Sequence, residues 1–402
     1  MEFSNIITSL EPSATLSISK KVRELKAEGK DVIGLTLGEP DFDTPVHIRE
    51  AAKKALDDGY THYPPVTGYP ELRQAIVDKL LRDNGLTYSP SQIVVSTGAK
   101  QSLYNIILAM INPGDGAILP APFWVSYHGI LHLAQADISI LPTTFESNYK
   151  ISPEQLEAAI KPHTKLFFLT SPSNPSGSMY SREEIAALVE VLERHPQVKI
   201  ISDEIYEYIT FGLEHISIAS FESVYDRTIV VNGFSKGYAM TGWRLGYIAA
   251  PLEIAKLSEK LQGQCTSGAN AFAQQGAIAA LTGGMESVIE MRDEFHSRRD
   301  MMFDKLSAIK GLKVNKPDGA FYFYPDFAEF LGRSTPNGTI IQNIDELCMF
   351  LIESTGLALV TGSAFGTSSH ARLSYAYSVE TLNDAIGRLS EGLSRLKIPA
   401  LK

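Results

Sequence analysis

Short apolar runs rich in β-branched residues alternate with longer amphipathic stretches between about residues 46 and 250, and this alternation allows few folds. Runs of this length fit strands buried on both faces, whereas the intervening stretches have helical spacing. Strands alternating with helices build a mostly parallel sheet that helices cover on both sides. We therefore predict an α/β domain whose seven strands span Gln92–Val95, Gly116–Leu119, Ile138–Leu141, Lys165–Thr170, Lys199–Ser202, Thr228–Val231 and Leu245–Ala249.

The pattern changes after residue 250, where a smaller α+β unit is expected. Long amphipathic stretches predict helices, and shorter strands and helices follow them. We divide the chain into an N-terminal arm (1–45), a large domain (46–290) and a C-terminal small domain (291–402), with a helix near Ser17–Lys26 packing on the small domain. The expected elements are helices at Leu252–Gln262, Asn270–Leu281, Ser287–Ile309, Ile344–Ser354 and Val379–Leu396, and strands at Ala320–Tyr324, Ala358–Val360 and Arg372–Tyr375.

Charge and cysteine content exclude several classes of protein. The 36 basic and 46 acidic residues give a net charge of −10, which disfavours nucleic acid and anionic membranes as partners. Cys265 and Cys348 lack metal-binding spacing and indicate a reducing compartment. No apolar run reaches the roughly 18 to 20 residues of a membrane span, and Met1–Asn5 has no basic leader pattern. We expect a cytoplasmic protein.

The loop Gly233–Gly237 follows a predicted strand and permits two kinds of chemistry. It matches the G-x-S-x-G nucleophile elbow, which would make Ser235 the nucleophile of a hydrolase, with His296 or His370 as its base. That elbow requires a helix directly after the serine. Here Met240–Tyr247 runs into another strand-like segment, so the hydrolase is the less favoured alternative.

The second interpretation of the same loop starts from Lys236. Small and apolar neighbours would desolvate its ammonium group and lower its pKa, which suits Schiff-base chemistry. Ser235 and Arg244 offer a hydroxyl and a guanidinium that are suited to a phosphate group. A reactive lysine beside a phosphate site indicates pyridoxal 5′-phosphate as cofactor.

Five segments in order along the chain resemble the motifs of class I aminotransferases, and the resemblance extends over essentially the whole chain. It implies the fold type I architecture, with a seven-stranded large domain and a small domain built from both chain ends. It also implies a pyridoxal-phosphate enzyme that moves amino groups between amino acids and 2-oxo acids. The segments are Gly38–Pro45, Ser171–Gly177, Ser202–Tyr206, Gly233–Gly246 and Arg372–Tyr375.

The resemblance assigns roles around the cofactor ring. Lys236 would form the Schiff base and move the substrate Cα proton. Asp203 follows an apolar run, and is therefore expected at the carboxyl end of a strand, where α/β sheets bind ligands. It would pair with the pyridine nitrogen. Tyr206 and Asn174 would bond to the phenolic oxygen, and Trp124 would stack on the ring.

The phosphate site is expected where Gly98, Ala99 and Lys100 open a helix after a strand. Free N–H groups at a helix start attract anions, and the resemblance adds Ser235 and Arg244 to this site. Tyr63 resembles the tyrosine that reaches the phosphate of the neighbouring subunit. A homodimer with shared active sites is therefore implied.

The remaining implied residues bind substrate. Arg372 would hold the α-carboxylate as a fork, beside the backbone of Gly38, with Asn174 and Trp124 also touching the substrate. Lys100 is similar to a lysine that serves dicarboxylates in bacterial and plastid aspartate aminotransferases. We therefore predict amino transfer from L-aspartate to 2-oxoglutarate. Thr15 matches a threonine of prephenate-competent relatives, and prephenate, aromatic or kynurenine-type substrates remain alternatives.

Two further hypotheses are disfavoured. His128 and His132 have i, i+4 spacing, but no third ligand accompanies them, so no metal is expected. A regulatory protein that binds the cofactor without catalysis is disfavoured because all four expected residues are retained, namely Lys236, Asp203, Tyr206 and Arg372.

Overall fold

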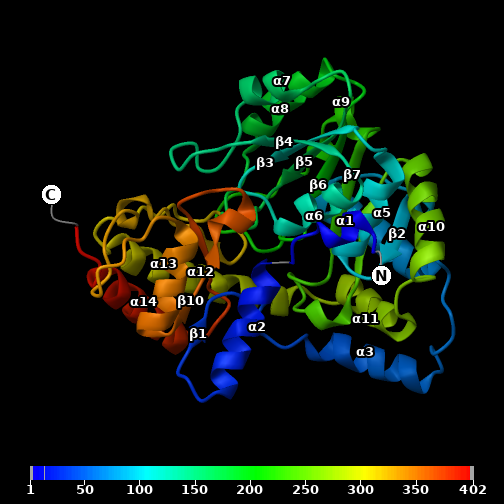
Figure 1. The fold of residues 1–402 in the computed structure, drawn as a ribbon. Coiled ribbons are helices and arrows are strands. Elements are labelled where there is room, and N and C mark those ends of the chain that lie inside the picture. The colour runs from blue at the N-terminus through cyan, green and yellow to red at the C-terminus, as the bar shows by residue number, and fades with distance from the viewer. Residues whose placement is uncertain (1–2, 13, 399–402) are drawn as a thin grey trace.

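A seven-stranded sheet forms the centre of the protein (Figure 1). The computed structural model describes residues 3–12 and 14–398. The strand order is β2-β8-β7-β6-β5-β3-β4, and all neighbours are parallel except β8, which is antiparallel to β2 and β7. The predicted sheet is confirmed. Its strands are β2 (Ile93–Ser96), β3 (Gly116–Pro120), β4 (Asp137–Leu141), β5 (Thr164–Thr170), β6 (Lys199–Asp203), β7 (Thr228–Gly233) and β8 (Gly246–Ala249).

Helices cover both faces of this sheet because both faces are apolar. Side chains of a strand alternate between faces: Val94 packs in one buried cluster, while Ile93 and Val95 pack in another. The first cluster contains α5 (Ala99–Met110), α6 (Val125–Leu133) and α10 (Leu252–Cys265). The opposite face is covered by α4 (Pro70–Asn84), α7 (Pro153–Ala159), α8 (Arg182–Glu193) and α11 (Ala271–Thr282), and α3 (Val46–Asp57) packs on α11.

A smaller α+β unit follows the large sheet. Its three-stranded antiparallel sheet has the order β11-β12-β9, and its helices pack around this sheet in one buried cluster. The elements are α12 (Glu286–Ser307), β9 (Tyr322–Phe323), α13 (Ile344–Thr355), β10 (Leu357–Ala358), β11 (Val360–Thr361), β12 (Ala371–Ser374) and α14 (Val379–Ser394).

Two strand predictions in this unit were wrong in extent. The single strand predicted over Ala358–Val360 is two short strands, because the chain leaves one sheet for another at Leu359. Both halves are buried, so the apolar run hides the break. The strand predicted from Ala320 begins only at Tyr322, since Ala320 has a left-handed backbone with φ 58°.

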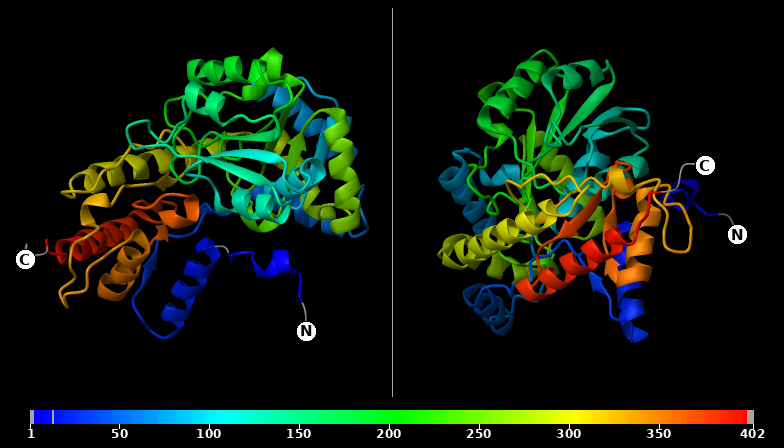
Figure 2. Two further views of the ribbon diagram at one scale, coloured as in Figure 1. Left: turned by 45° about the horizontal axis from the view of Figure 1, so that its top comes forward. Right: turned by 90° about the vertical axis from the view of Figure 1, so that its left-hand side faces the viewer.

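The N-terminal segment joins the C-terminal unit (Figure 2). Helix α2 (Ala14–Ala27) buries Val22 and Leu25 against Ala358, and β1 (Ile33–Gly34) pairs in parallel with β10. Along α12, Val288 packs with the large domain and Phe295 packs with the small unit. We propose a domain boundary there, giving 1–45, 46–290 and 291–402. Two one-turn helices, α1 (Asn5–Thr8) and α9 (Glu222–Tyr225), complete the α-helices described. Within residues 3–12 and 14–398, no helix has the length and apolar character needed to cross a membrane.

Candidate active site

A cavity of about 420 Å³ lies at the carboxyl ends of β5 and β6, between the large sheet and the small unit. Thr170 and Asp203 end the two strands and line it, and Tyr322 of the small unit closes the opposite side. The cavity brings together most residues that the sequence singled out. These are Gly38, Ala99, Lys100, Trp124, Asn174, Asp203, Tyr206, Ser235, Lys236, Arg244 and Arg372.

Lys236 lies in the turn after β7, and its Nζ donates a hydrogen bond to the carbonyl oxygen of Gly38. Burial, assisted by the positive charge of Arg372, lowers the pKa of Lys236 to about 8. A substantial fraction of the amine is therefore neutral at slightly alkaline pH, and a neutral amine is the nucleophilic form.

Asp203 is buried at the end of β6, and two donors hold its carboxylate. The Tyr127 hydroxyl donates to Oδ2 at 2.5 Å, and the Ile205 N–H donates to Oδ1 at 3.3 Å. Burial raises the pKa of Asp203 to about 6 despite these bonds. The carboxylate is therefore ionised at neutral pH and can accept a hydrogen bond from a protonated ring nitrogen. The sequence analysis did not find Tyr127, whose place on an apolar helix resembles a core position.

Tyr206 follows Asp203 by one turn and bonds to a second tyrosine that the sequence analysis missed. The hydroxyls of Tyr206 and Tyr322 are 2.8 Å apart, and the Arg372 guanidinium lies 4.5 Å from the centre of the Tyr322 ring. Burial raises the pKa of Tyr206 well above its ordinary value, so the hydroxyl stays protonated and can donate. Tyr322 therefore connects Tyr206 to Arg372.

Helix α5 begins at the cavity, and two glycines allow the close approach of its neighbours. A Cβ on Gly98 would lie 2.6 Å from Nη2 of Arg244, and one on Gly246 would lie 2.2 Å from the Ala99 nitrogen. The first N–H groups of a helix have no partner within it. With Ser235 and Arg244 beside them, they form a site suited to a phosphate.

Arg372 is only 1% exposed, and one of its three guanidinium nitrogens has no hydrogen-bond partner among the described residues. Nη1 donates to Asn174 Oδ1 at 3.0 Å, and Nη2 donates to the Thr36 carbonyl at 2.7 Å. Among the described residues, Nε has no hydrogen-bond partner. A Cβ on Gly38 would lie 2.9 Å from the Tyr322 hydroxyl, so only glycine leaves this side of the cavity open. A buried guanidinium of this kind suits a carboxylate ligand.

Lys100 is a further cation in the cavity. Its Nζ lies 5.0 Å from the centre of the Trp124 ring, and burial together with Arg244 lowers the pKa of Lys100. Trp124 precedes α6 and packs edge-on against Tyr127, with ring centres 5.4 Å apart.

Two predicted residues, Gly98 and Tyr63, are not among the residues that line the cavity in the described subunit. Tyr63 is 94% exposed and does not line it. Thr15 lies in α2, but its side chain falls outside the part that the structure describes. His128 and His132 contact different neighbours, because His128 stacks on Phe123 and His132 bonds to Ser9.

The geometry does not support the hydrolase alternative. After Ser235 the chain forms a turn, a short 3-10 helix at Thr241–Trp243 and then β8, in place of the required helix. Of the two candidate bases, His296 pairs with Asp300 and His370 bonds to Ser369, and neither lines the cavity.

A mostly parallel sheet with a buried aspartate, a lysine of lowered pKa and a phosphate-type helix start defines the fold type I class of pyridoxal-phosphate enzymes. The comparisons specify the family. The family profile "Aminotransferase class I and II" matches residues 30–389. An aspartate/prephenate aminotransferase from Cereibacter sphaeroides is 46% identical over 388 residues, which are 96% of this chain and 97% of that protein.

Solved structures agree with this assignment. The aspartate aminotransferase of Rhizobium meliloti is 41% identical with a TM-score of 0.96, covering 99% of this chain and 100% of that one. The Thermus thermophilus aspartate aminotransferase with maleate is 37% identical with a TM-score of 0.92, covering 98% and 100%. The chain therefore belongs to the class I and II aminotransferases, and it is an aminotransferase that uses pyridoxal 5′-phosphate.

Proposed function

We propose that this enzyme transfers the amino group of L-aspartate to 2-oxoglutarate, giving oxaloacetate and L-glutamate. The observation that carries the proposal is that Lys100 lines the same cavity as Arg372. A dicarboxylate needs two cationic groups, and Arg372 alone would satisfy only its α-carboxylate. The names of the relatives support the same substrate, since the Thermus thermophilus structure is that of an aspartate aminotransferase with maleate.

The residues of the cavity fit the cofactor. Asp203 would accept the N–H of the pyridine ring, Tyr206 and Asn174 would bond to the phenolic oxygen, and Trp124 would cover the ring. The phosphate would be held beside Gly98 by the N–H groups of Ala99 and Lys100 and by the side chains of Ser235 and Arg244. When bound, pyridoxal 5′-phosphate supplies an electron sink for the negative charge that develops at the substrate Cα.

Lys236 carries the proton chemistry in this proposal. Its pKa of about 8 keeps it near the pH at which a general base is both neutral and basic enough to act. The amine removes the proton from the Cα of the amino acid and gives a proton back later in the cycle. Arg372 and Gly38 hold the α-carboxylate during this transfer, so that the Cα–H bond keeps one orientation toward Lys236.

Prephenate is a second candidate substrate. The Cereibacter sphaeroides relative is named an aspartate/prephenate aminotransferase, and Thr15 matches the threonine expected of such enzymes. Prephenate also carries two carboxylates, so Arg372 and Lys100 would serve it in the same way. Aromatic or kynurenine-type substrates would leave the charge of Lys100 unpaired, which disfavours them.

A homodimer completes the proposed site. The Tyr63 ring is exposed in the single chain, so burying it against a second subunit would add hydrophobic stabilisation. An exposed position is what a residue reaching the neighbouring subunit's phosphate would have in a single chain.

We also propose a cytoplasmic location, which the two free cysteines Cys265 and Cys348 fit.

The test is an absorption spectrum of the purified holoenzyme with L-aspartate. We expect the cofactor band to convert to the aminated form and to be restored by 2-oxoglutarate, which would demonstrate both half-reactions. A band that responds to alanine or phenylalanine but not to aspartate would remove the role proposed for Lys100. Replacement of 2-oxoglutarate by prephenate tests the second candidate in the same sample.

A further inference from the structure

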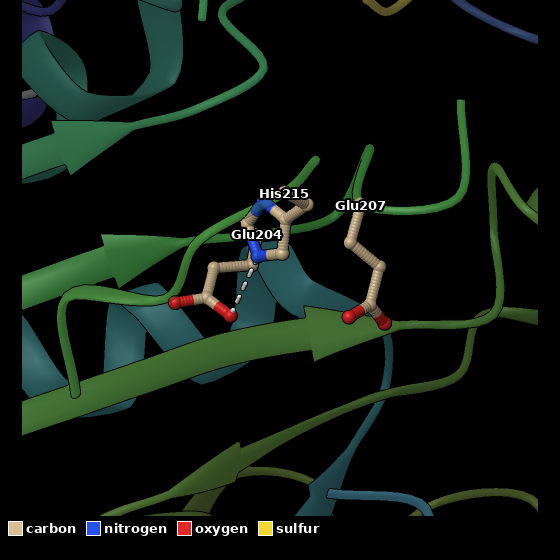
Figure 3. Close-up of side chains that lie close together, drawn as sticks. All are labelled: Glu204, Glu207 and His215. Carbon is tan, nitrogen blue, oxygen red and sulfur yellow. Dashed lines mark hydrogen bonds and ion pairs between the residues drawn. The ribbon is translucent and has the colours of Figure 1, made fainter. Parts of the chain in front are cut away.

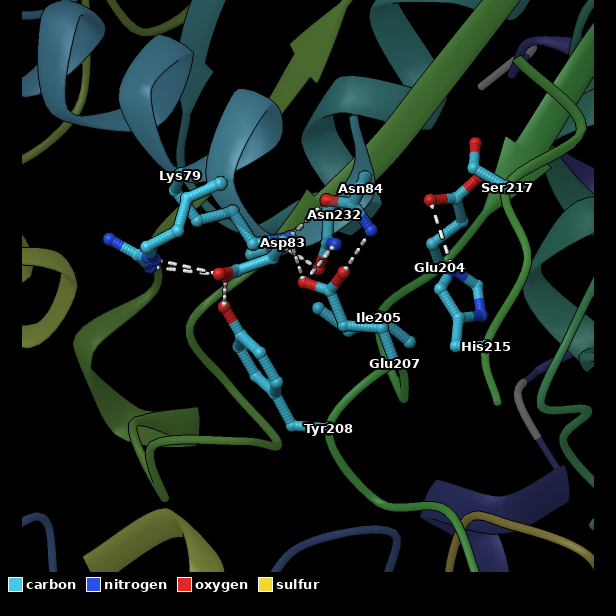
Figure 4. Close-up of polar contacts among 12 residues, drawn as sticks. Lys79, Asp83, Asn84, Glu204, Ile205, Glu207, Tyr208, His215, Ser217 and Asn232 are labelled. Atoms are coloured by element: carbon cyan, nitrogen blue, oxygen red, sulfur yellow. Dashed lines mark hydrogen bonds and ion pairs between the residues drawn. The ribbon is translucent and has the colours of Figure 1, made fainter. Parts of the chain in front are cut away.

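Behind the active site, Glu207 forms a buried hub that receives two hydrogen bonds and one ion pair (Figure 4). Its Oε1 forms an ion pair with Lys79 Nζ at 2.5 Å and accepts a hydrogen bond from Asn232 Nδ2 at 2.8 Å. Its Oε2 accepts from Asn84 Nδ2 at 3.0 Å. Lys79 is 1% exposed and also donates to Asn84 Oδ1 at 2.7 Å. The carboxylate is thus fully satisfied without lining the cavity.

The donors come from two elements, and Glu207 itself stands on a third. Lys79 and Asn84 belong to α4, whereas Asn232 lies near the end of β7, the strand that leads to Lys236. Glu207 directly follows Tyr206, in the turn that begins after Asp203. The hub therefore joins α4 to the two segments that carry the groups facing the cofactor site.

Tyr208 adds a packing contact to the same arrangement. A Cβ on Gly237 would lie 2.6 Å from Tyr208 Cδ2, so the Tyr208 ring packs directly against the backbone beside Lys236. Lys79 Nζ lies 5.2 Å from the centre of this ring, and the Tyr208 hydroxyl donates to Asp83 Oδ2 at 2.6 Å. The position of the Lys236 loop is thus coupled to the residues around Glu207.

The neighbouring acidic cluster could be taken for a metal site. Ligand atoms of Glu204, Glu207 and His215 lie within 4.8 Å of one another (Figure 3). Their oxygens are already used, because Glu204 accepts from Ser202, Ser217 and His215, and Glu207 neutralises Lys79. A cation would have to displace these donors, so the cluster is better explained as a set of buried hydrogen-bonded pairs.

We propose that Glu207 is a positioning residue for amino transfer: its bonds to Lys79, Asn84 and Asn232 hold Asp203, Tyr206 and Lys236 in the geometry that the reaction needs. The inference rests on the roles proposed above for those three residues. A buried ion pair adds little net stability compared with well-packed apolar side chains, but it fixes the relative position of the two segments that carry its charges. Active-site groups must be held within about half an ångström, and displacements near 1 Å can cost on the order of 100-fold in rate.

Three variants test the proposal. Glu207→Gln keeps the size of the side chain and an oxygen that can accept from Asn232, but it leaves Lys79 unpaired. The double variant Glu207→Gln with Lys79→Met removes both buried charges together. Glu184→Gln is the matched control, because it breaks the ion pair of a glutamate with Lys150 in a region that does not line the cavity.

The measurements are the melting temperature, the kcat and KM for aspartate, and the pH midpoint at which the absorbance of the bound cofactor changes. That midpoint depends on the charges around Lys236, and a merely structural role would not move it. For both Glu207 variants we expect kcat to fall on the order of 10-fold or more, KM to stay within about twofold, and the midpoint to shift. The double variant should recover melting temperature, and Glu184→Gln should keep the kcat and midpoint of the wild type.

A double variant with the wild-type kcat and midpoint would overturn the proposal, because Glu207 would then contribute only stability. If Glu207→Gln does not accumulate as folded protein, Asn232→Ala decides, since it removes the bond to Glu207 on the Lys236 side and leaves the Lys79–Glu207 pair. An unchanged midpoint in Asn232→Ala would overturn the proposal as well. If the wild type fails to use aspartate, the proposed substrate is refuted, while the absorbance comparison still tests Glu207.

Discussion

Replacing Tyr127 by phenylalanine removes the hydroxyl that donates to Asp203 at 2.5 Å and keeps the ring packing. A hydrogen bond to a charged group contributes about 1.5 to 3 kcal/mol, and 1.36 kcal/mol corresponds to roughly one pKa unit. The bond favours the ionised carboxylate, so its loss raises the pKa of Asp203 further. From about 6 in the free enzyme, the pKa should rise by roughly one to two units.

This shift has a defined sign in cofactor binding. Only the ionised Asp203 can accept the ring N–H of the cofactor, so affinity falls as pH drops through the pKa of Asp203 in the free enzyme. In Tyr127→Phe the fall should begin at a pH about one to two units higher, and near pH 7 affinity should be roughly two- to tenfold weaker than in the wild type. At about pH 9 the two proteins should bind almost equally.

The assay is a titration of the apoenzyme with pyridoxal 5′-phosphate between pH 5.5 and 9, followed by absorbance. Titrations of the free cofactor are common to both proteins and cancel in the ratio of their affinities. Tyr149→Phe is the matched control, because Tyr149 is buried and donates to the Tyr324 carbonyl at 2.9 Å outside the cavity. An affinity ratio between Tyr127→Phe and the wild type that does not change with pH would refute the reasoning.

Three other substitutions test individual roles. Lys236→Ala should abolish amino transfer, because Lys236 is the group proposed to take the Cα proton; substantial turnover in a steady-state assay would contradict its role. Lys100→Met should raise the KM for aspartate on the order of 10-fold or more and leave alanine little affected; equal effects on both amino acids would remove Lys100 from substrate recognition. Tyr322→Phe loses the bond to Tyr206 but keeps the ring beside Arg372, so kcat should fall about fivefold at constant KM; a rise in KM alone would show that the hydroxyl serves the substrate.

The central sheet was predictable because strands buried on both faces consist of consecutive apolar residues. Phe167 and Val230 lie in uninterrupted apolar runs, and both are fully buried. Where burial does not distinguish two strands, the prediction was wrong, as at Leu359, where the chain passes from a pair with β1 to a pair with β12. Hydrophobicity reports that a residue is inside the protein, but it does not report which sheet the residue joins.

Most cavity residues were found because they stand in motifs, but their partners were not. Tyr127 lies on an apolar helix and Tyr322 in the aromatic run Phe321–Tyr324, so both resemble core residues in sequence. Their hydroxyls meet Asp203 and Tyr206 only because separate parts of the chain pack together. A buried tyrosine hydroxyl needs a partner, but sequence spacing does not indicate which one it has.

The segment Asp203–Glu207 shows how the fold divides acidic groups between two tasks. It contains three carboxylates within five residues, and composition alone does not rank them. The end of the strand distinguishes them. Asp203 is the last residue of β6 and lines the cavity, whereas Glu204 does not line it and bonds to Ser202 and His215. Glu207 forms an ion pair with Lys79. Each rear carboxylate faces a basic partner, which leaves Asp203 as the acidic group of this segment that is open to a cationic ligand.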